Sequence, residues 1–313
     1  MKLGLNLFLW SGQTTEALFP VLEKVKRWGY DGVEFPLFHT DEHVYQRVRE
    51  KLDQLGLRCT GCTVAMPDKN PISDSESVRQ AGIEHVKEML RMCHILGAEV
   101  LCGPLCAPVG GLVGRGRNAD EWSRAVAALR AVGPTAEETG VTVAVEYLNR
   151  FETYFINTVA DTRALVEEVG HPRIRMMYDT FHANIEEKEI YRSAKACGKM
   201  LAHVHISEND RGVPGSGQVE WSDLFRALGE LKYAGWLTIE SFGQAVPEIA
   251  AAAAIWRPLF RDADEVGKKG IQFLRKNAPS PRPKRRAGRT AAARRKKPKA
   301  GRKKGVKARA RKR

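Results

Sequence analysis

The amino-acid sequence predicts a (β/α)8 (TIM) barrel, and two observations carry this prediction. Eight short apolar runs rich in β-branched residues recur along the chain, and each gap between them has room for one helix. Several of the intervening helical patterns close with glycine just before the next run, which is a common helix end. Eight strands alternating with helices over about 250 residues are typical of a closed parallel barrel. The alternative is an open doubly wound sheet, which usually has G-x-G-x-x-G after its first strand, whereas S-G-Q-T-T-E follows here.

The predicted strands follow one another with similar spacing. In chain order they cover residues 3–10, 32–38, 58–65, 99–105, 141–148, 174–181, 201–207 and 236–242. Helical patterns such as A-L-F-P-V-L-E-K-V-K-R-W-G-Y lie between them. We therefore expect one folded domain over residues 1–278, with its active site at the carboxyl ends of the strands.

The net charge of +14 in this 313-residue chain is concentrated at one end. Residues 279–313 contain 18 Lys and Arg and no Asp or Glu, so residues 1–278 carry a net charge of −4. The basic tail has too little apolar surface to fold, and we expect it to be disordered. Its Lys and Arg alternate with Ala, Pro and Gly as in histone-like tails, which makes nonspecific binding to nucleic acid or another polyanion a hypothesis.

The sequence favours a cytoplasmic protein without a membrane span. No apolar run reaches 18 residues, and Gly4 and Asn6 interrupt the apolar stretch at the N-terminus, which has no small-residue cleavage site after it. The six cysteines lack the spacing of a disulfide framework, as expected in a reducing compartment.

Ionisable residues interrupt the last four predicted strands near their ends. They are Glu146, Asp179, His205 and Glu240, each between apolar neighbours. Three carboxylates and an imidazole converging on one barrel mouth would repel one another or remain unpaired unless a cation lay among them. Such an oxygen-rich set suits Mn²⁺, Mg²⁺ or Co²⁺. His203 shares a strand face with His205, and we expect it to be a hydrogen-bonded residue of the barrel interior.

Four segments together resemble the ketose 3-epimerases, the D-tagatose 3-epimerase and D-psicose 3-epimerase group of the xylose-isomerase-like TIM barrels. The segments are A-V-E-Y-L-N-R-F-E-T, D-T-F-H-A-N-I-E-E, H-V-H-I-S-E-N-D-R-G-V-P-G-S-G and I-E-S-F. The resemblance covers residues 1–275. It implies one divalent metal per subunit, Mn²⁺ first, bound by Glu146, Asp179, His205 and Glu240. It also implies a homodimer or homotetramer.

The resemblance further implies contacts with a ketose substrate. Glu152, His182 and Arg211 match the family's substrate-binding positions, and the C-G-P of the fourth strand brings Gly103 near the sugar. Cys62, Phe242 and Trp10 are candidates for apolar walls. The glycine-rich loop after His205 is expected to bring its backbone, and Arg211, close to the sugar.

The implied reaction inverts C3 of a ketose such as D-tagatose, D-fructose or L-ribulose. A metal chelated by the C2 and C3 oxygens stabilises an enediolate. Glu146 and Glu240, on strands that approach the barrel axis from different sides, then act as acid and base. His182 and Arg211 hold the C2 oxygen.

Two other functions stay open. A related isomerase or dehydratase, of the hydroxypyruvate isomerase or inosose dehydratase type, shares parts of the same motifs. A DNA-repair enzyme of the endonuclease IV type is disfavoured, because its three-zinc site needs histidines on the second and third strands, where this chain has none. His39 and His43 follow the second strand without an evident partner near the third.

Overall fold

The computed structural model describes residues 1–279 and 305, and it confirms the barrel. Eight parallel strands pair in chain order, and the first strand pairs with the last, so the sheet is closed. The strands are β1 (Lys2–Asn6), β2 (Gly32–Pro36), β3 (Arg58–Cys62), β4 (Val100–Gly103), β5 (Thr142–Val145), β6 (Ile174–Asp179), β7 (Leu201–Ile206) and β8 (Trp236–Ile239). The predicted basic tail and its nucleic-acid hypothesis lie outside the described residues.

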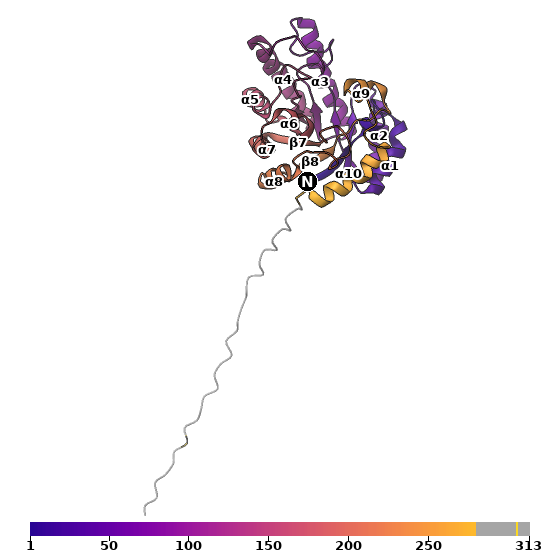
Figure 1. Ribbon diagram of the computed structural model, residues 1–313. Helices are drawn as coiled ribbons and strands as arrows, with labels where there is room; N and C mark the ends of the chain where they lie inside the picture. Colours follow the sequence, from indigo (N-terminus) through magenta and orange to yellow (C-terminus); the bar gives the residue numbers. More distant parts are fainter. Residues whose placement is uncertain (280–304, 306–313) are drawn as a thin grey trace, which may run out of the picture. The chain divides into compact units, whose positions relative to one another are not determined.

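Helices surround the barrel and follow the strands (Figure 1). They are α1 (Phe19–Trp28), α2 (Glu42–Leu55), α3 (Glu76–Leu96), α4 (Ala119–Thr139), α5 (Val159–Val169), α6 (Thr180–Glu186), α7 (Ile190–Ala196), α8 (Trp221–Glu230), α9 (Pro247–Ala252) and α10 (Ala263–Asn277). Three 3-10 helices add single turns: η1 (Leu7–Leu9), η2 (Glu16–Leu18) and η3 (Gly198–Met200). Helices α1 to α5 each end at a glycine with positive φ, as the sequence predicts. None of the helices within residues 1–279 is long and apolar enough to cross a membrane.

The core has two layers that the strand alternation separates. Val143 and Val145 of β5 point outward into the large cluster between barrel and helices, and Ala144 points inward. The inner apolar cluster consists of Cys62, Val100, Cys102, Ala144, Met177 and Trp236. The barrel interior is therefore apolar at this level, and polar side chains fill the levels nearer the carboxyl ends.

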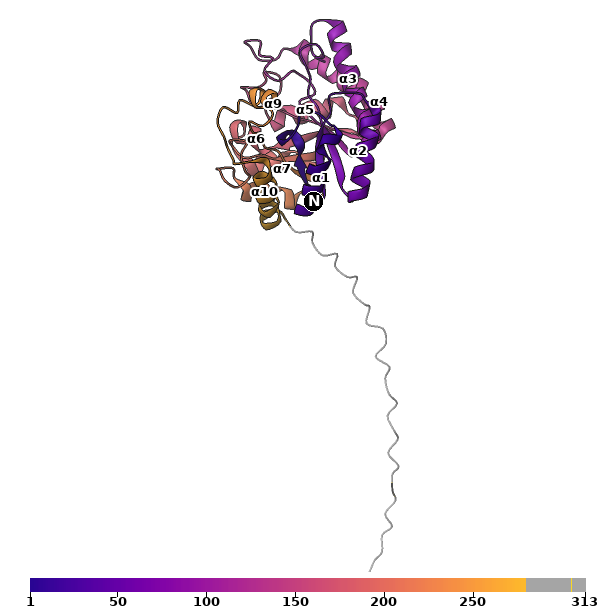
Figure 2. The ribbon, with the colours of Figure 1, turned by 90° about the vertical axis from the view of Figure 1, so that its right-hand side faces the viewer.

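Several strands are shorter than predicted, and β1 shows why. The predicted strand ran to Trp10, but the chain leaves the sheet after Asn6 and forms η1. The side chain of Asn6 accepts a hydrogen bond from the backbone N–H of Phe8 at 2.8 Å, which favours a helical turn. The end of the barrel that carries α9 is the carboxyl end of the strands, opposite the N-terminus (Figures 1 and 2).

Candidate active site

The four predicted metal ligands lie at the carboxyl ends of consecutive strands. Asp179 is the last residue of β6 and His205 the last but one of β7, while Glu146 and Glu240 directly follow β5 and β8. All four are buried, with exposed fractions of 0, 0, 6 and 5 %, respectively. The parallel barrel thus gathers these side chains at one end, because each strand delivers its terminal residues to the same rim.

His205 is the centre of this group. Its Nδ1 lies 3.5 Å from Oδ2 of Asp179 and 3.3 Å from Oε1 of Glu240. Asp179, His205 and Glu240 each offer a ligand atom within 4.8 Å of the others, and Glu146, Asp179 and His182 form an adjoining group of the same kind. The buried Nδ1 of His205 makes no hydrogen bond. A divalent cation would satisfy this nitrogen and the surrounding carboxylates together, so the residues fit such a cofactor.

The charges around the cluster push the carboxyl pKa values apart. Burial raises the pKa of Glu146 well above its usual range, and the neighbouring carboxylates of Glu240 and Asp179 add to this effect. Burial also opposes ionisation of Asp179, but Arg211 and the nearby histidines outweigh it and lower the pKa of Asp179. Two buried carboxyl groups with different proton affinities are a common basis for acid–base chemistry.

Arg211 reaches into the cluster from the loop after β7. Its Nη1 donates to Oε2 of Glu240 at 2.6 Å and to Oδ2 of Asp179 at 3.3 Å. The guanidinium group lies 3.9 Å from the ring centre of Phe181 and 4.9 Å from that of Phe242. The φ of Arg211 is +65°, a left-handed conformation that its surroundings must hold. These contacts fix the arginine with its charge directed at the carboxylates.

His182 lies between N–H donors at the same site. The backbone N–H of Asn149 donates to Nδ1 of His182 at 3.0 Å, and Nη2 of Arg211, which can only donate, lies 3.2 Å from Nε2. That Nε2 lies 3.6 Å from Oε1 of Glu146. Burial lowers the pKa of His182 to about 3, which keeps the ring neutral. The neutral ring therefore lies beside Glu146 and Arg211, within reach of an oxygen bound between them.

A cavity of about 340 Å³ opens above the cluster. Seven of the residues predicted to touch metal or substrate line it: Cys62, Glu146, Glu152, His182, Arg211, Glu240 and Phe242. Phe8, Phe38, Val64 and Leu148 add apolar surface, and Ile249 and Ala252 of α9 close one side. Glu152 accepts a hydrogen bond from Nδ2 of Asn149 at 2.8 Å, and burial raises its pKa. The volume and the mixed lining are typical of a small-molecule site.

Two predicted substrate residues are not among the residues that line the cavity. Trp10 packs against Trp28 of α1, with ring centres 6.4 Å apart. Gly103 lies behind the cavity wall, where its carbonyl accepts the backbone N–H of Glu146 at 3.0 Å. A Cβ on Gly103 would lie 2.1 Å from the carbonyl oxygen of Thr63, and its φ is +127°. Close backbone packing therefore explains this glycine without a sugar contact.

The glycine-rich loop also differs from the expectation. Of its residues, Arg211 lines the cavity, whereas the backbone of the loop folds around the buried side chain of Glu208. A Cβ on Gly217 would lie 2.0 Å from Oδ1 of Asn209, and Gly215 has a φ of +85°. The glycines are thus required by packing within the loop.

Two buried carboxylates, Glu34 of β2 and Glu208 of this loop, were not predicted from the sequence. Glu34 lies in G-V-E-F-P, where a carboxylate between apolar residues was the same signal that identified Glu146 and Glu240. Both oxygens of Glu34 contact the two histidines of β7, at 2.8 Å from Nε2 of His203 and 2.7 Å from Nε2 of His205. His203 is a buried interior residue as expected, but neither of its ring nitrogens makes the expected hydrogen bond.

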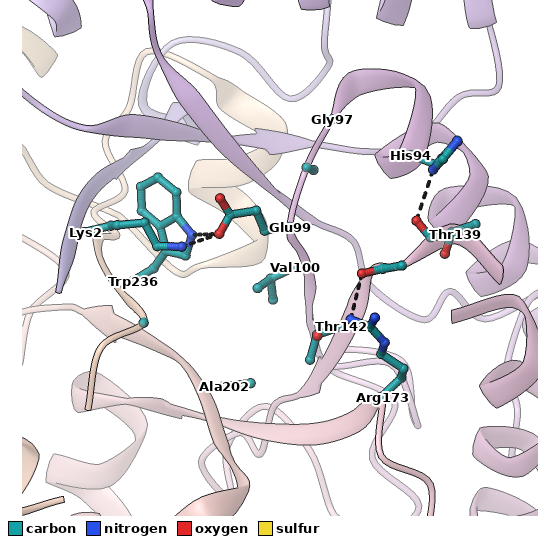
Figure 3. A pocket seen from close by; sticks show the side chains of 13 residues that line it. Lys2, His94, Gly97, Glu99, Val100, Thr139, Thr142, Arg173, Ala202 and Trp236 are labelled. Carbon is teal, nitrogen blue, oxygen red and sulfur yellow. Dashed lines mark hydrogen bonds and ion pairs between the residues drawn. The ribbon is translucent and has the colours of Figure 1, made fainter. Parts of the chain in front are cut away.

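A second cavity, of about 460 Å³, lies at the amino ends of the strands. Figure 3 shows Lys2 and Trp236 together on one side of Glu99, and its carboxylate contacts both side chains. Arg58 also pairs with Glu99, so this carboxylate joins β1, β3 and β8. In parallel barrels this end contributes to stability, and the opposite end performs the chemistry. The candidate active site is therefore the cavity at the carboxyl ends.

The closed parallel barrel, with buried carboxylates and a histidine gathered at the carboxyl ends of its strands, has the architecture of a TIM-barrel enzyme. Comparisons with known proteins identify the family. Residues 22–277 match the family model described as "Xylose isomerase-like TIM barrel". The chain is 32% identical over 275 residues to a "Probable ketose 3-epimerase" of Synechocystis sp., covering 88% of this chain and 96% of that protein. It is 31% identical to an "L-ribulose 3-epimerase" of Mesorhizobium japonicum, covering 87% of this chain and 93% of the relative.

A solved structure shows the same similarity in three dimensions. The D-allulose 3-epimerase from Methylomonas sp. in complex with D-allulose has a TM-score of 0.82 and 27% identity, with 88% of this chain and 97% of that chain covered. The chain therefore belongs to the xylose isomerase-like TIM barrel family, within the group of ketose 3-epimerases. The resemblance seen in the sequence motifs is confirmed, and with it the isomerase class, as an epimerase of carbohydrates.

Proposed function

We propose that the protein is a metal-dependent epimerase that inverts C3 of a free ketose of the D-tagatose, D-fructose or L-ribulose type. The observation that carries this proposal is the convergence of Glu146, Asp179, His205 and Glu240 beneath a cavity of about 340 Å³. A cavity of this size and polarity suits a small sugar. The names of the relatives point in the same direction.

One divalent cation per subunit completes the proposed site, with Mn²⁺ as the first expectation and Mg²⁺ or Co²⁺ as alternatives. Glu146, Asp179, His205 and Glu240 would hold it, since three carboxylates and one imidazole suit a hard or borderline cation. When bound, the cation supplies Lewis-acid stabilisation of negative charge on the sugar oxygens beside C3.

Glu146 and Glu240 exchange the protons in this proposal. Epimerisation removes the C3 proton, which is acidic because it lies next to the C2 carbonyl, and returns a proton to the opposite face of the enediolate. The two carboxyl groups follow β5 and β8 and reach the cavity from different sides. Glu146 acts as the proton donor in one direction of the reaction. Glu240 accepts a hydrogen bond from Arg211 and suits a base, and the roles reverse in the other direction.

The remaining polar side chains orient the sugar. The guanidinium group of Arg211 donates to the C2 oxygen, whose charge grows during proton removal, and the ring of His182 helps to hold that oxygen. Glu152 has a free carboxylate oxygen for a sugar hydroxyl, because its Oε1 accepts from Asn149. Phe242 and Cys62 form apolar wall on the same cavity.

The test is incubation of metal-depleted protein with D-tagatose, D-fructose or L-ribulose, with and without Mn²⁺, followed by chromatography of the sugars. A C3 epimer should form only with metal, and Glu240→Gln should abolish it. The matched control is Glu189→Gln, which changes an exposed carboxylate and should keep wild-type turnover.

One other outcome would redirect the assignment. Turnover of hydroxypyruvate or an inosose without any epimer would replace the ketose by the substrate of a related isomerase or dehydratase. An endonuclease is disfavoured further: His39 bonds to the carbonyl of Thr14 and stacks on Tyr45, and neither it nor His43 joins a ligand cluster within residues 1–279.

We also propose a homodimer or homotetramer in the cytoplasm. Phe151 and Trp256 are 71% and 74% exposed and line one surface pocket, so they offer apolar area for a second copy. Light scattering of the wild type and of Trp256→Ser tests the assembly, and a monomeric wild type would contradict it.

The six cysteines are all free, which agrees with a reducing compartment.

Binding of the basic tail to polyanions stays a proposal, tested by salt-dependent fluorescence anisotropy with labelled duplex DNA.

A further inference from the structure

Glu34 lies directly beneath the proposed metal site and is fully buried. Four side chains bond to its two oxygens: Asn6 Nδ2 at 2.9 Å, Thr60 Oγ1 at 2.8 Å, Cys102 Sγ at 3.3 Å and His205 Nε2 at 2.7 Å. Nε2 of His203 lies 2.8 Å away without making a hydrogen bond. An ionised carboxylate has about four lone-pair directions and accepts only. The surroundings of Glu34 are therefore those of an ionised acceptor.

This donor set decides which nitrogen of His205 carries the proton. Because the Glu34 carboxylate accepts, the Nε2 that lies 2.7 Å from it must donate an N–H. In a neutral imidazole the lone pair then belongs to Nδ1. That nitrogen is the one facing Asp179 and Glu240, at 3.5 and 3.3 Å. The hydrogen bond thus fixes both the tautomer of the ring and its direction.

We propose that Glu34 is a positioning residue for the metal: it holds the proton of His205 on Nε2 and so presents Nδ1 to a divalent cation. This inference rests on the proposed function, because it assumes that His205 is a ligand. Carboxylates that accept from a ligating histidine commonly raise metal affinity by orienting the ring and increasing its basicity. Removing such a partner typically lowers metal affinity about 10- to 100-fold.

His203 provides the matched comparison. Its Nε2 contacts the other oxygen of Glu34 at 2.8 Å, and its ring packs edge-on against His205 with ring centres 5.1 Å apart. It touches the same carboxylate as His205 but offers no atom to the cluster with Asp179 and Glu240. A substitution at His203 therefore disturbs the same buried network without removing the bond to His205.

A second cation between Glu34, Cys102, His203 and His205 is the competing explanation, since these four residues also offer ligand atoms within 4.8 Å. The separation of 2.7 Å between Nε2 of His205 and Glu34 is a hydrogen bond, whereas Nε2 of His203, at 2.8 Å, makes no hydrogen bond. A proton accounts for the His205 contact, and the stoichiometry of metal binding separates the two explanations.

The first experiment titrates Mn²⁺ into metal-depleted full-length protein by calorimetry. We expect one site per chain in the wild type, a dissociation constant about 10- to 100-fold higher in Glu34→Gln, and a change below about threefold in His203→Asn. Thermal unfolding of the metal-free variants reports their stability separately. A destabilised Glu34→Gln with wild-type affinity, equal weakening in both variants, or two sites per chain would each overturn the proposal.

The second experiment needs no substitution of Glu34. Protein labelled with ¹⁵N-histidine and loaded with diamagnetic Mg²⁺ should show His205 protonated on Nε2 by NMR, with the signal assigned by its loss in His205→Gln. A proton on Nδ1 would refute the proposal even if Glu34→Gln fails to fold. Neither experiment uses turnover, so loss of the ketose assignment leaves both results interpretable.

Discussion

Glu208 provides the sharpest test of how the loop after β7 holds Arg211. Its buried carboxylate accepts hydrogen bonds from the backbone N–H groups of Gly215 at 2.7 Å, Asn209 at 3.1 Å and Val219 at 3.2 Å. The carbonyl of Glu208 also accepts the N–H of Arg211 at 3.0 Å. One side chain therefore fixes both ends of the loop that carries the arginine.

Glu208→Ala would leave these three N–H groups without their acceptor. An unsatisfied buried donor costs about 1–3 kcal/mol, so a closed loop would lose about 3 kcal/mol or more. The loop can avoid that loss by opening to water, and we expect local opening rather than global unfolding. A cost of about 3 kcal/mol for the closed, active state corresponds to a fall in kcat/KM of roughly 100-fold, since 1.4 kcal/mol is about tenfold.

Two measurements check this prediction. Hydrogen–deuterium exchange should become faster in residues 208–219 while the strands keep wild-type protection, and kcat/KM for the ketose should fall. Glu220→Ala, which removes an exposed carboxylate next to the loop, should leave both quantities unchanged. Wild-type exchange and a kcat/KM within threefold of wild type in Glu208→Ala would refute the reasoning.

Three further predictions concern stability. Gly103→Ala should destabilise the fold by about 3 kcal/mol or more in urea unfolding, because its Cβ would lie 2.1 Å from the carbonyl oxygen of Thr63. The control Gly114→Ala, whose Cβ would meet no atom within 4 Å, should cost about 1 kcal/mol or less. Glu99→Gln should reduce the free energy of unfolding by about 1–2 kcal/mol and so lower the melting temperature. It should not change kcat, because the ion pairs of Glu99 lie at the end of the barrel opposite the cavity; a reduced kcat would contradict this. Burial lowers the pKa of His85 to about 4, so its contribution to the free energy of unfolding is complete above about pH 6.5 and falls between pH 6.5 and 4. In urea unfolding, His85→Gln should remove about 2 kcal/mol of this pH dependence, and a free energy of unfolding with the wild-type pH dependence would contradict the prediction.

The barrel was predictable because its signals are local and repeated. Eight apolar runs separated by amphipathic helices ending in glycine require no knowledge of distant contacts. The carboxylates and the histidine of the last four strands were predictable for a related reason. The carboxyl ends of parallel strands lie together in every such barrel, so the position of Asp179 or Glu240 along its own strand is sufficient.

The sequence pattern did not predict contacts between side chains that face each other across the barrel interior. The bond between Glu34 and His205 joins residues 171 positions apart, and it depends on how β2 and β7 face each other across the interior. For Trp10, a local capping bond from Asn6 ends the strand early, and Trp10 is not among the residues that line the cavity. The role of Glu208 depends on the path of a loop, which periodicity does not describe.

The origin of the site residues along the chain has a consequence for folding. The predicted metal ligands come from β5 to β8, whereas the carboxylate beneath His205 comes from β2, and β1 closes the ring against β8. Contacts of such large sequence separation form slowly, because long segments of chain must be ordered before they can be made. Tight metal binding should therefore emerge only at the end of refolding, after the first and last strands have paired. During synthesis, the same order would delay metal acquisition until the final strand has left the ribosome.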